Sequence, residues 1–126
     1  IKANFDDSFN YVFCPAYKND TEKAESVYKN ALIAFDGSDF KIKGARVQIV
    51  QLECFHNEVV PCMKRSWFHD DFKEGTNGVA LEDTEAIKKV LTNDEFREEI
   101  VNNNKLLLEK HKCENVAKDF IRIISE

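Results

Sequence analysis

Short apolar runs that alternate with helix-forming segments are the feature that most constrains the fold of this chain. Four runs have the composition of strands: FNYVFC (9–14), ALIAF (31–35), VVPCM (59–63) and GVAL (78–81). Two segments with the periodicity of helices, 20–30 and 45–57, separate the first three runs. Parallel strands need such crossover connections, whereas hairpins do not. The sequence therefore predicts an α/β fold of doubly wound type with a parallel sheet.

The last third of the chain has the periodicity of helices. Three segments carry apolar residues at helical spacing: 83–91, 95–111 and 114–126. Asp83 or Thr84 can cap the first helix, and Asn93 with Asp94 can cap the second. The third helix gathers apolar side chains on one face: Val116, Ala117, Phe120, Ile121 and Ile124. The sequence thus predicts a Rossmann-like parallel sheet followed by a C-terminal helical tail.

Length, charge and cysteine content limit the class of protein. A chain of 126 residues predicts a single domain, 1–126, that can bury a core. The net charge of −5 argues against this chain alone binding a nucleic-acid backbone, although a partner domain could contact DNA. No apolar run approaches the roughly 20 residues that span a bilayer. With four irregularly spaced cysteines and no leader pattern, we expect reduced thiols and a cytoplasmic rather than secreted protein.

A carboxylate lies inside an otherwise apolar stretch, GARVQIVQLECFHNEVVP (44–61), where Glu53 is near the centre. A buried charge costs several kcal/mol unless it is paired. Five cations occupy two loops that should follow neighbouring strands: Lys41, Lys43, Arg46, Lys64 and Arg65. Such loops meet at the carboxyl edge of a parallel sheet, and a helix that starts near Ala45 would favour an anion there. The sequence therefore predicts an anion site, suited to a phosphate. The alternative is a scatter of solvated lysines, which is the better interpretation of Lys41 and Lys43 taken singly.

The residues alone leave two roles open for Glu53. Arg46 and Glu53 are seven residues apart, which places them two turns apart on one helix face. Together they could span a nucleotide diphosphate and its ribose, whose vicinal hydroxyls donate to a carboxylate. Alternatively, Glu53 pairs with Arg46, Lys64 or a backbone group inside the domain.

Metal and redox chemistry fit the sequence less well. The spacing of the potential zinc ligands matches no familiar site, so we expect no metal: Cys54, His56, Cys62 and His69. A thioredoxin-like domain would need a Cys-x-x-Cys pair, which Cys14 lacks. The alternative function is a secreted ligand-binding or interaction domain without catalytic activity, with disulfides Cys14–Cys113 and Cys54–Cys62.

Several motifs, taken in order, resemble the C-terminal, nucleotide-sugar-binding half of glycosyltransferases with two Rossmann-like domains, the GT-B architecture. These motifs are VYKNALIAFDGS (27–38), LECFHNEVVPCM (52–63), EGTNGVALED (74–83) and the helical segment from Ala86 onward. The resemblance covers roughly residues 9–124. It implies a hexosyltransferase whose donor substrate is a nucleotide diphosphate sugar such as UDP-glucose, with no cofactor. The acceptor-binding half would be another chain or an N-terminal region that precedes this one.

The resemblance also assigns roles to residues. Glu53, the second residue of the Leu-Glu pair, would bind the ribose hydroxyls of the donor. The preceding segment and the neighbouring strand ends would contact the diphosphate and sugar, which points to Ser38, Gly44, Ala45, Arg46 and Lys64. We further expect the helix 114–124 to leave its apolar face partly uncovered, because in a GT-B enzyme this helix crosses toward the other domain.

Three features depart from the family pattern. Ala45 stands where retaining members carry a second glutamate, so the sugar contacts must differ. Asn57, Glu58 and two valines occupy the region where a glycine is common before the proline. The longer spacing from Glu53 to Pro61 is most similar to phage DNA α-glucosyltransferases, which modify hydroxymethylcytosine. That narrower resemblance implies a DNA acceptor, bound through the other half, in a phage-infected bacterial cell.

Overall fold

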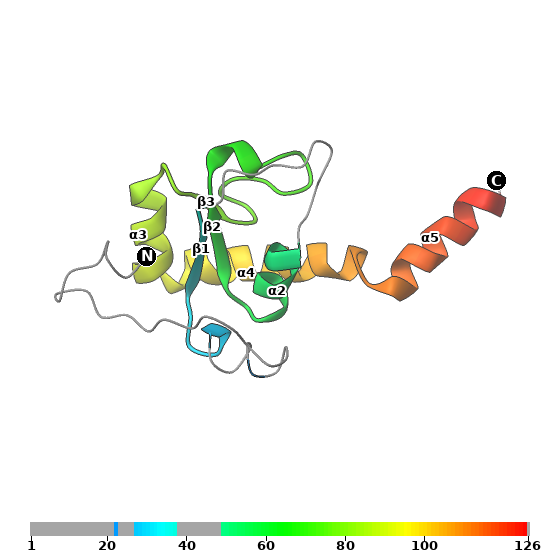
Figure 1. The fold of residues 1–126 in the computed structure, drawn as a ribbon, viewed down its shortest axis with the longest axis horizontal. Coiled ribbons are helices and arrows are strands. Elements are labelled where there is room, and N and C mark those ends of the chain that lie inside the picture. Colours follow the sequence, from blue (N-terminus) through cyan, green and yellow to red (C-terminus); the bar gives the residue numbers. More distant parts are fainter. Residues whose placement is uncertain (1–21, 23–26, 38–48, 126) are drawn as a thin grey trace.

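The computed structural model describes residue 22, residues 27–37 and residues 49–125 of the chain (Figure 1). The strands are β1 (Ile33–Asp36), β2 (Val60–Met63) and β3 (Val79–Ala80). The helices are α2 (Ile49–His56), the 3-10 helix η3 (Arg65–Trp67), α3 (Thr84–Thr92), α4 (Asp94–Lys110) and α5 (Cys113–Ser125). Helices interleaved with strands and a helical C-terminal part make this an α/β protein, as the sequence predicted.

The three strands form a parallel sheet in the order β1-β2-β3. Ile33 of β1 lies opposite Val60 of β2, and Cys62 of β2 lies opposite Val79 of β3. Helix α2 belongs to the connection from β1 to β2, whereas η3 and a loop connect β2 to β3. The predicted parallel pairing is therefore confirmed for these three strands.

The central strand β2 is buried along its whole length and separates two apolar clusters. Val60 and Cys62 pack with Val79, Val90 and Ile100, on the side of α3. The alternate positions of the strand face a second cluster on the side of α2, which contains Tyr28, Cys54, Phe55, Val59, Met63, Trp67, Phe72 and Leu107. Because successive side chains of a strand point to opposite faces, one short apolar run supplies both cores.

Side-chain caps fix the starts of α3 and α4. The Asp83 carboxylate accepts a hydrogen bond from the backbone N–H of Ala86 at 3.0 Å, and the Asn93 side chain accepts one from Phe96 at 3.0 Å. Each cap satisfies an N–H group that has no partner within its helix. The predicted caps are confirmed, and of the two candidates for α3 it is Asp83 that caps the helix.

Helix α5 extends away from the rest of the described structure (Figure 1). None of its residues is buried. Its large apolar side chains are more than half exposed, with Val116 at 52%, Phe120 at 63% and Ile124 at 66%. The expectation that this face stays uncovered is therefore confirmed.

Several predicted boundaries shift or cannot be placed. Strand β1 begins at Ile33, two residues later than predicted, because the backbone N–H of Ala31 closes a turn onto the Tyr28 carbonyl at 3.1 Å. Helix α2 is described from Ile49 and ends at His56. The predicted strand 9–14, most of the predicted helix 20–30 and the start of the predicted helix 45–57 lie outside the described residues. Within the described ranges, no helix is long and apolar enough to cross a membrane.

A close backbone approach at Gly78 sets the distance between β2 and the loop that leads to β3. A Cβ atom on Gly78 would lie 2.6 Å from the carbonyl oxygen of Pro61, closer than real Cβ contacts allow. By contrast, a Cβ atom on Gly37 would have no neighbour within 4 Å. Only glycine therefore fits at Gly78 without movement of the sheet.

We expect Gly78→Ala to lower the free energy of unfolding by about 1–3 kcal/mol, since the added methyl group forces the loop and strand apart. The control Gly37→Ala should change it by no more than about 0.5 kcal/mol, because that site is open. Urea unfolding of both variants measures the difference. Equal effects of the two substitutions would contradict the close approach.

Candidate functional site

The carboxyl ends of the parallel strands bring charged residues to one edge of the sheet. Asp36 ends β1 opposite Met63 of β2, so Lys64 follows directly beside the end of β1. The backbone N–H of Leu81 donates to the Met63 carbonyl at 2.9 Å and carries the chain past the end of β3 to Glu82. Ligands of open parallel sheets bind at this edge. Lys64, a predicted site residue, lies there and is half-buried.

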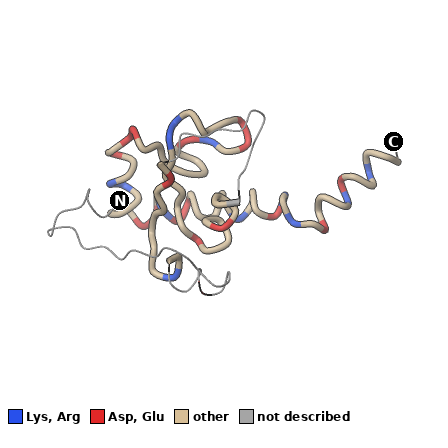
Figure 2. The backbone as a smooth tube through the Cα atoms, in the orientation of Figure 1, with Lys and Arg blue, Asp and Glu red and all other residues tan. Residues whose placement is uncertain are grey.

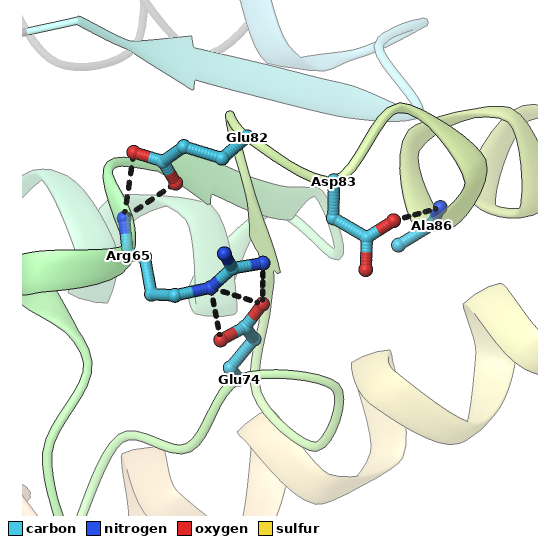
Figure 3. A network of polar contacts seen from close by, with 5 residues as sticks. All are labelled: Arg65, Glu74, Glu82, Asp83 and Ala86. Carbon is cyan, nitrogen blue, oxygen red and sulfur yellow. Dashed lines mark hydrogen bonds and ion pairs between the residues drawn. The ribbon is translucent and has the colours of Figure 1, made fainter.

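Arg65, next to Lys64, is held by carboxylates from two other segments (Figure 3). Its Nε donates to both oxygens of Glu74 at 3.0 Å each, and its Nη2 donates to Glu74 Oε1 at 2.9 Å. Its backbone N–H donates to Glu82 Oε2 at 2.9 Å. The hydrogen bonds and charge of Glu74 raise the pKa of the Arg65 guanidinium. Arg65 therefore serves to join the end of β2 to the loop before β3.

This network changes the charge balance that the sequence suggested. The sequence places Arg65 with four other cations in a predicted anion site. In the structure, however, the Arg65 side chain binds Glu74. Glu82 and Asp83 add negative charge nearby and further raise the pKa of Arg65. An anion at this edge must therefore rely on cations other than Arg65.

Glu53 lies in the second turn of α2 and is half-buried. Its Oε2 accepts a hydrogen bond of 2.9 Å from the hydroxyl of Tyr28. The ring of Tyr28 is buried in the same cluster as Cys54 and Phe55, the two residues after Glu53. The Glu53 carbonyl accepts from the backbone N–H and the side-chain amide of Asn57, at 3.1 and 2.8 Å, close to the end of the helix. The carboxylate is thus fixed from two directions, through its own oxygen and through its backbone.

The remaining predicted site residues lie outside the described residues: Ser38, Gly44, Ala45 and Arg46. Lys41 and Lys43 lie there as well. What the structure places is Lys64 at the carboxyl edge of the sheet and Glu53 on the helix between β1 and β2.

Sequence reasoning gave no site role to Tyr28, Glu74 or Glu82. Tyr28 belongs to the apolar stripe of a predicted helix, and no local pattern links it to a carboxylate 25 residues further along. Glu74 lies nine residues after Arg65 across an irregular loop, so no helix or strand period pairs them. These contacts come from the tertiary fold, which periodicity does not specify.

The described cysteines are free thiols. Cys54 and Cys62 are buried and Cys113 is exposed. The disulfide Cys54–Cys62 that the alternative function required is therefore not formed, and Cys14 lies outside the described residues. Burial raises the pKa of the Cys62 thiol to about 11, and the charge of Glu82 adds to the effect.

Three surface hollows of the described residues lie away from Glu53 and Lys64. In the described part of the chain, no group of three or more His, Cys, Asp or Glu side chains could hold a metal ion. Three surface hollows are lined by α3 with the start of α4 (about 710 Å³), by Glu58 with the middle of α4 (about 290 Å³), and by residues 70–77 with the second half of α4 (about 250 Å³). Glu53 and Lys64 line none of these three.

Comparison with known proteins found no match to a protein-family model, a curated protein or a solved structure.

In native protein at pH 8, we expect Cys62 to react with a thiol reagent at least about a hundredfold more slowly than an ordinary thiol, because a pKa two units higher lowers the thiolate fraction a hundredfold. Exposed Cys113 should react before the buried Cys54 and Cys62. Because the pKa of Cys62 is higher in the folded than in the unfolded protein, the contribution of this thiol to the free energy of unfolding is complete below pH 9. That contribution is lost as the pH rises toward 11.

Thiol counting under non-reducing conditions checks the oxidation state at the same time. In denaturant all four cysteines should react. A count of two or none would support the disulfide-bonded alternative, and rapid labelling of Cys62 in the native protein would contradict its burial.

Proposed function

We propose that this chain is the donor-binding half of a glycosyltransferase of GT-B architecture, which transfers a hexose from a nucleotide diphosphate sugar. The observation that carries the proposal is Glu53: a half-buried carboxylate on the helix between two parallel strands, fixed by a tyrosine hydroxyl. In the proposed complex, Glu53 accepts hydrogen bonds from the ribose hydroxyls of the donor.

The topology supports this placement. Gly37, the last described residue after β1, lies at the carboxyl edge of the sheet, where ligands of open parallel sheets bind. The next residues along the chain, 38–48, include Ser38, Gly44, Ala45 and Arg46, which we propose contact the diphosphate and sugar. Lys64 at the end of β2 adds a cation on the neighbouring strand.

Glu58 lies in the turn between α2 and β2. Glu58 has a φ of 60°, in the left-handed region that favours glycine. The family's glycine lies just before the proline, so Glu58, three residues before Pro61, remains a departure from the family pattern. Its carboxylate forms an exposed ion pair with Lys105 at 2.6 Å.

The chemical step needs stabilisation of the leaving diphosphate. We propose that Arg46 and the N-terminal end of the helix containing Glu53 supply positive charge as the sugar–phosphate bond breaks. The acceptor and its base would come from the other half of the enzyme. The narrower proposal, a phage DNA glucosyltransferase acting in the cytoplasm of an infected cell on UDP-glucose, rests on the spacing from Glu53 to Pro61.

Helix α5 provides the surface that this second half would cover. Its apolar face is exposed, and positive and negative residues are interspersed along α4 and α5 (Figure 2). Arg122 Nη2 lies 3.8 Å from Asp119 Oδ1 on the same helix, so these two charges balance each other within α5. An apolar face with balanced flanks suits a protein surface more than an anionic lipid surface.

For Glu53→Gln we expect an unfolding free energy within about 0.5 kcal/mol of the wild type, because the amide oxygen still accepts from Tyr28. Binding of UDP-glucose should weaken by roughly 1–3 kcal/mol, since the charged acceptor is lost. Calorimetric titration and thermal melts measure the two effects, with Glu99→Gln on the exposed surface of α4 as the control. A loss of several kcal/mol of stability without ligand would show that Glu53 is a structural ion-pair residue.

For Phe120→Ala on α5, we expect the unfolding free energy of this chain to change by less than about 1 kcal/mol, because the ring is 63% exposed. Ile100→Ala, at a fully buried site on α4, should cost about 2–5 kcal/mol. Urea unfolding compares them. Equal costs would show that α5 packs within this chain and would remove the reason for a covering partner.

A further inference from the structure

The hydroxyl of Tyr28 joins two parts of the molecule that are far apart in sequence. Its donor bond to Glu53 Oε2 spans 25 residues and is 2.9 Å long. Tyr28 is only 6% exposed and belongs to the apolar cluster that contains Cys54, Phe55 and Met63. Because that ring is anchored in the core, the position of its hydroxyl is set by packing rather than by solvent.

A fixed donor on one oxygen constrains how a carboxylate can be used. A carboxylate has two oxygens and about four lone-pair directions, and its terminal torsion is broad when nothing holds it. A hydrogen bond to Oε2 selects one orientation of the carboxylate plane. The two hydrogen bonds that Asn57 donates to the Glu53 carbonyl hold the backbone of Glu53 in place. The orientation of the carboxylate is therefore set before any ligand arrives, which lowers the entropic cost of binding two vicinal hydroxyls.

Building on the proposed ribose-binding role of Glu53, we propose that Tyr28 is a positioning residue that sets the orientation of this carboxylate and thereby its preference for ribonucleotides over 2′-deoxyribonucleotides. A merely structural tyrosine would affect stability and would weaken both ligand classes equally. A positioning tyrosine acts on the difference between them, because only the ribonucleotide has the 2′-hydroxyl that uses the fixed acceptor.

The test measures binding of uridine, adenosine and guanosine diphosphates to the chain by calorimetry, each beside its 2′-deoxy counterpart. The ratio of the two dissociation constants is the readout. In Tyr28→Phe, which removes only the hydroxyl, we expect the ratio to fall about three- to tenfold, as for the loss of one hydrogen bond. Affinity for the deoxynucleotide should fall less, because it offers only its 3′-hydroxyl to the Glu53 carboxylate.

Two further variants separate positioning from packing. Glu53→Asp keeps the charge but withdraws the carboxylate from Tyr28 by one methylene. It should therefore reduce the preference for ribonucleotides to a similar degree. This variant still tests the contact if Tyr28→Phe fails to fold. In a Glu53→Gln background, Tyr28→Phe should change the ratio no further, because its effect passes through the carboxylate.

The outcomes distinguish the two levels of the proposal. If Glu53→Gln abolishes the ribose preference and Tyr28→Phe leaves it intact, the positioning role is overturned while the ribose site stands. If Tyr28→Phe weakens ribo- and deoxynucleotides equally, its role is structural and the inference is also overturned. If the wild-type chain binds none of these nucleotides, the proposed function fails and this inference fails with it.

Discussion

Burial of β2 on both faces is the constraint on which the rest of the structure depends. Val60 and Cys62 have no exposed surface, and Met63 keeps only 3%. A strand of this kind must be covered by helices on both sides, because an uncovered face would leave apolar side chains in water. Helix α2 supplies residues to one cluster and α3 to the other. Helix α4 contributes to both, because Leu107 belongs to the cluster beside α2 and Ile100 to the cluster beside α3. Helix α2, which covers one face, also lies in the crossover connection between the parallel strands β1 and β2.

A sealed central strand also determines where polar groups can lie. Polar side chains are excluded from β2 itself and appear at once where it ends, at Lys64 and Arg65. The connection to β3 has no α-helix to stabilise it, so side-chain hydrogen bonds hold it in place. Asn77, buried at 7% exposure, donates to Asn104 of α4 at 3.0 Å, and Asn104 donates back to the Asn77 carbonyl at 2.9 Å. These bonds satisfy polar groups that burial would otherwise leave unpaired.

Local signals in the sequence predicted much of the fold but little of the polar chemistry. The apolar run at 59–63, the caps Asp83 and Asn93 and the period of α5 all depend on residues within one or two turns, and each appears in the structure as expected. The start of β1 was wrong by two residues because the turn at Ala31 competes with strand formation. The contacts of Arg65 and Glu53 depend on where distant segments meet, and no period in the sequence encodes that distance.

The Glu53 contact separates what stability requires from what the proposed function requires. If stability alone mattered at this position of α2, an apolar residue beside the cluster of the Tyr28 ring would cost less than a carboxylate, which must be desolvated and supplied with donors. A phenylalanine in place of Tyr28 could then complete the core. The chain instead keeps a carboxylate and a hydroxyl that satisfy each other at 2.9 Å. Such a pair adds little net stability but gives the acceptor a fixed orientation, which is the property that recognition of a ligand hydroxyl needs.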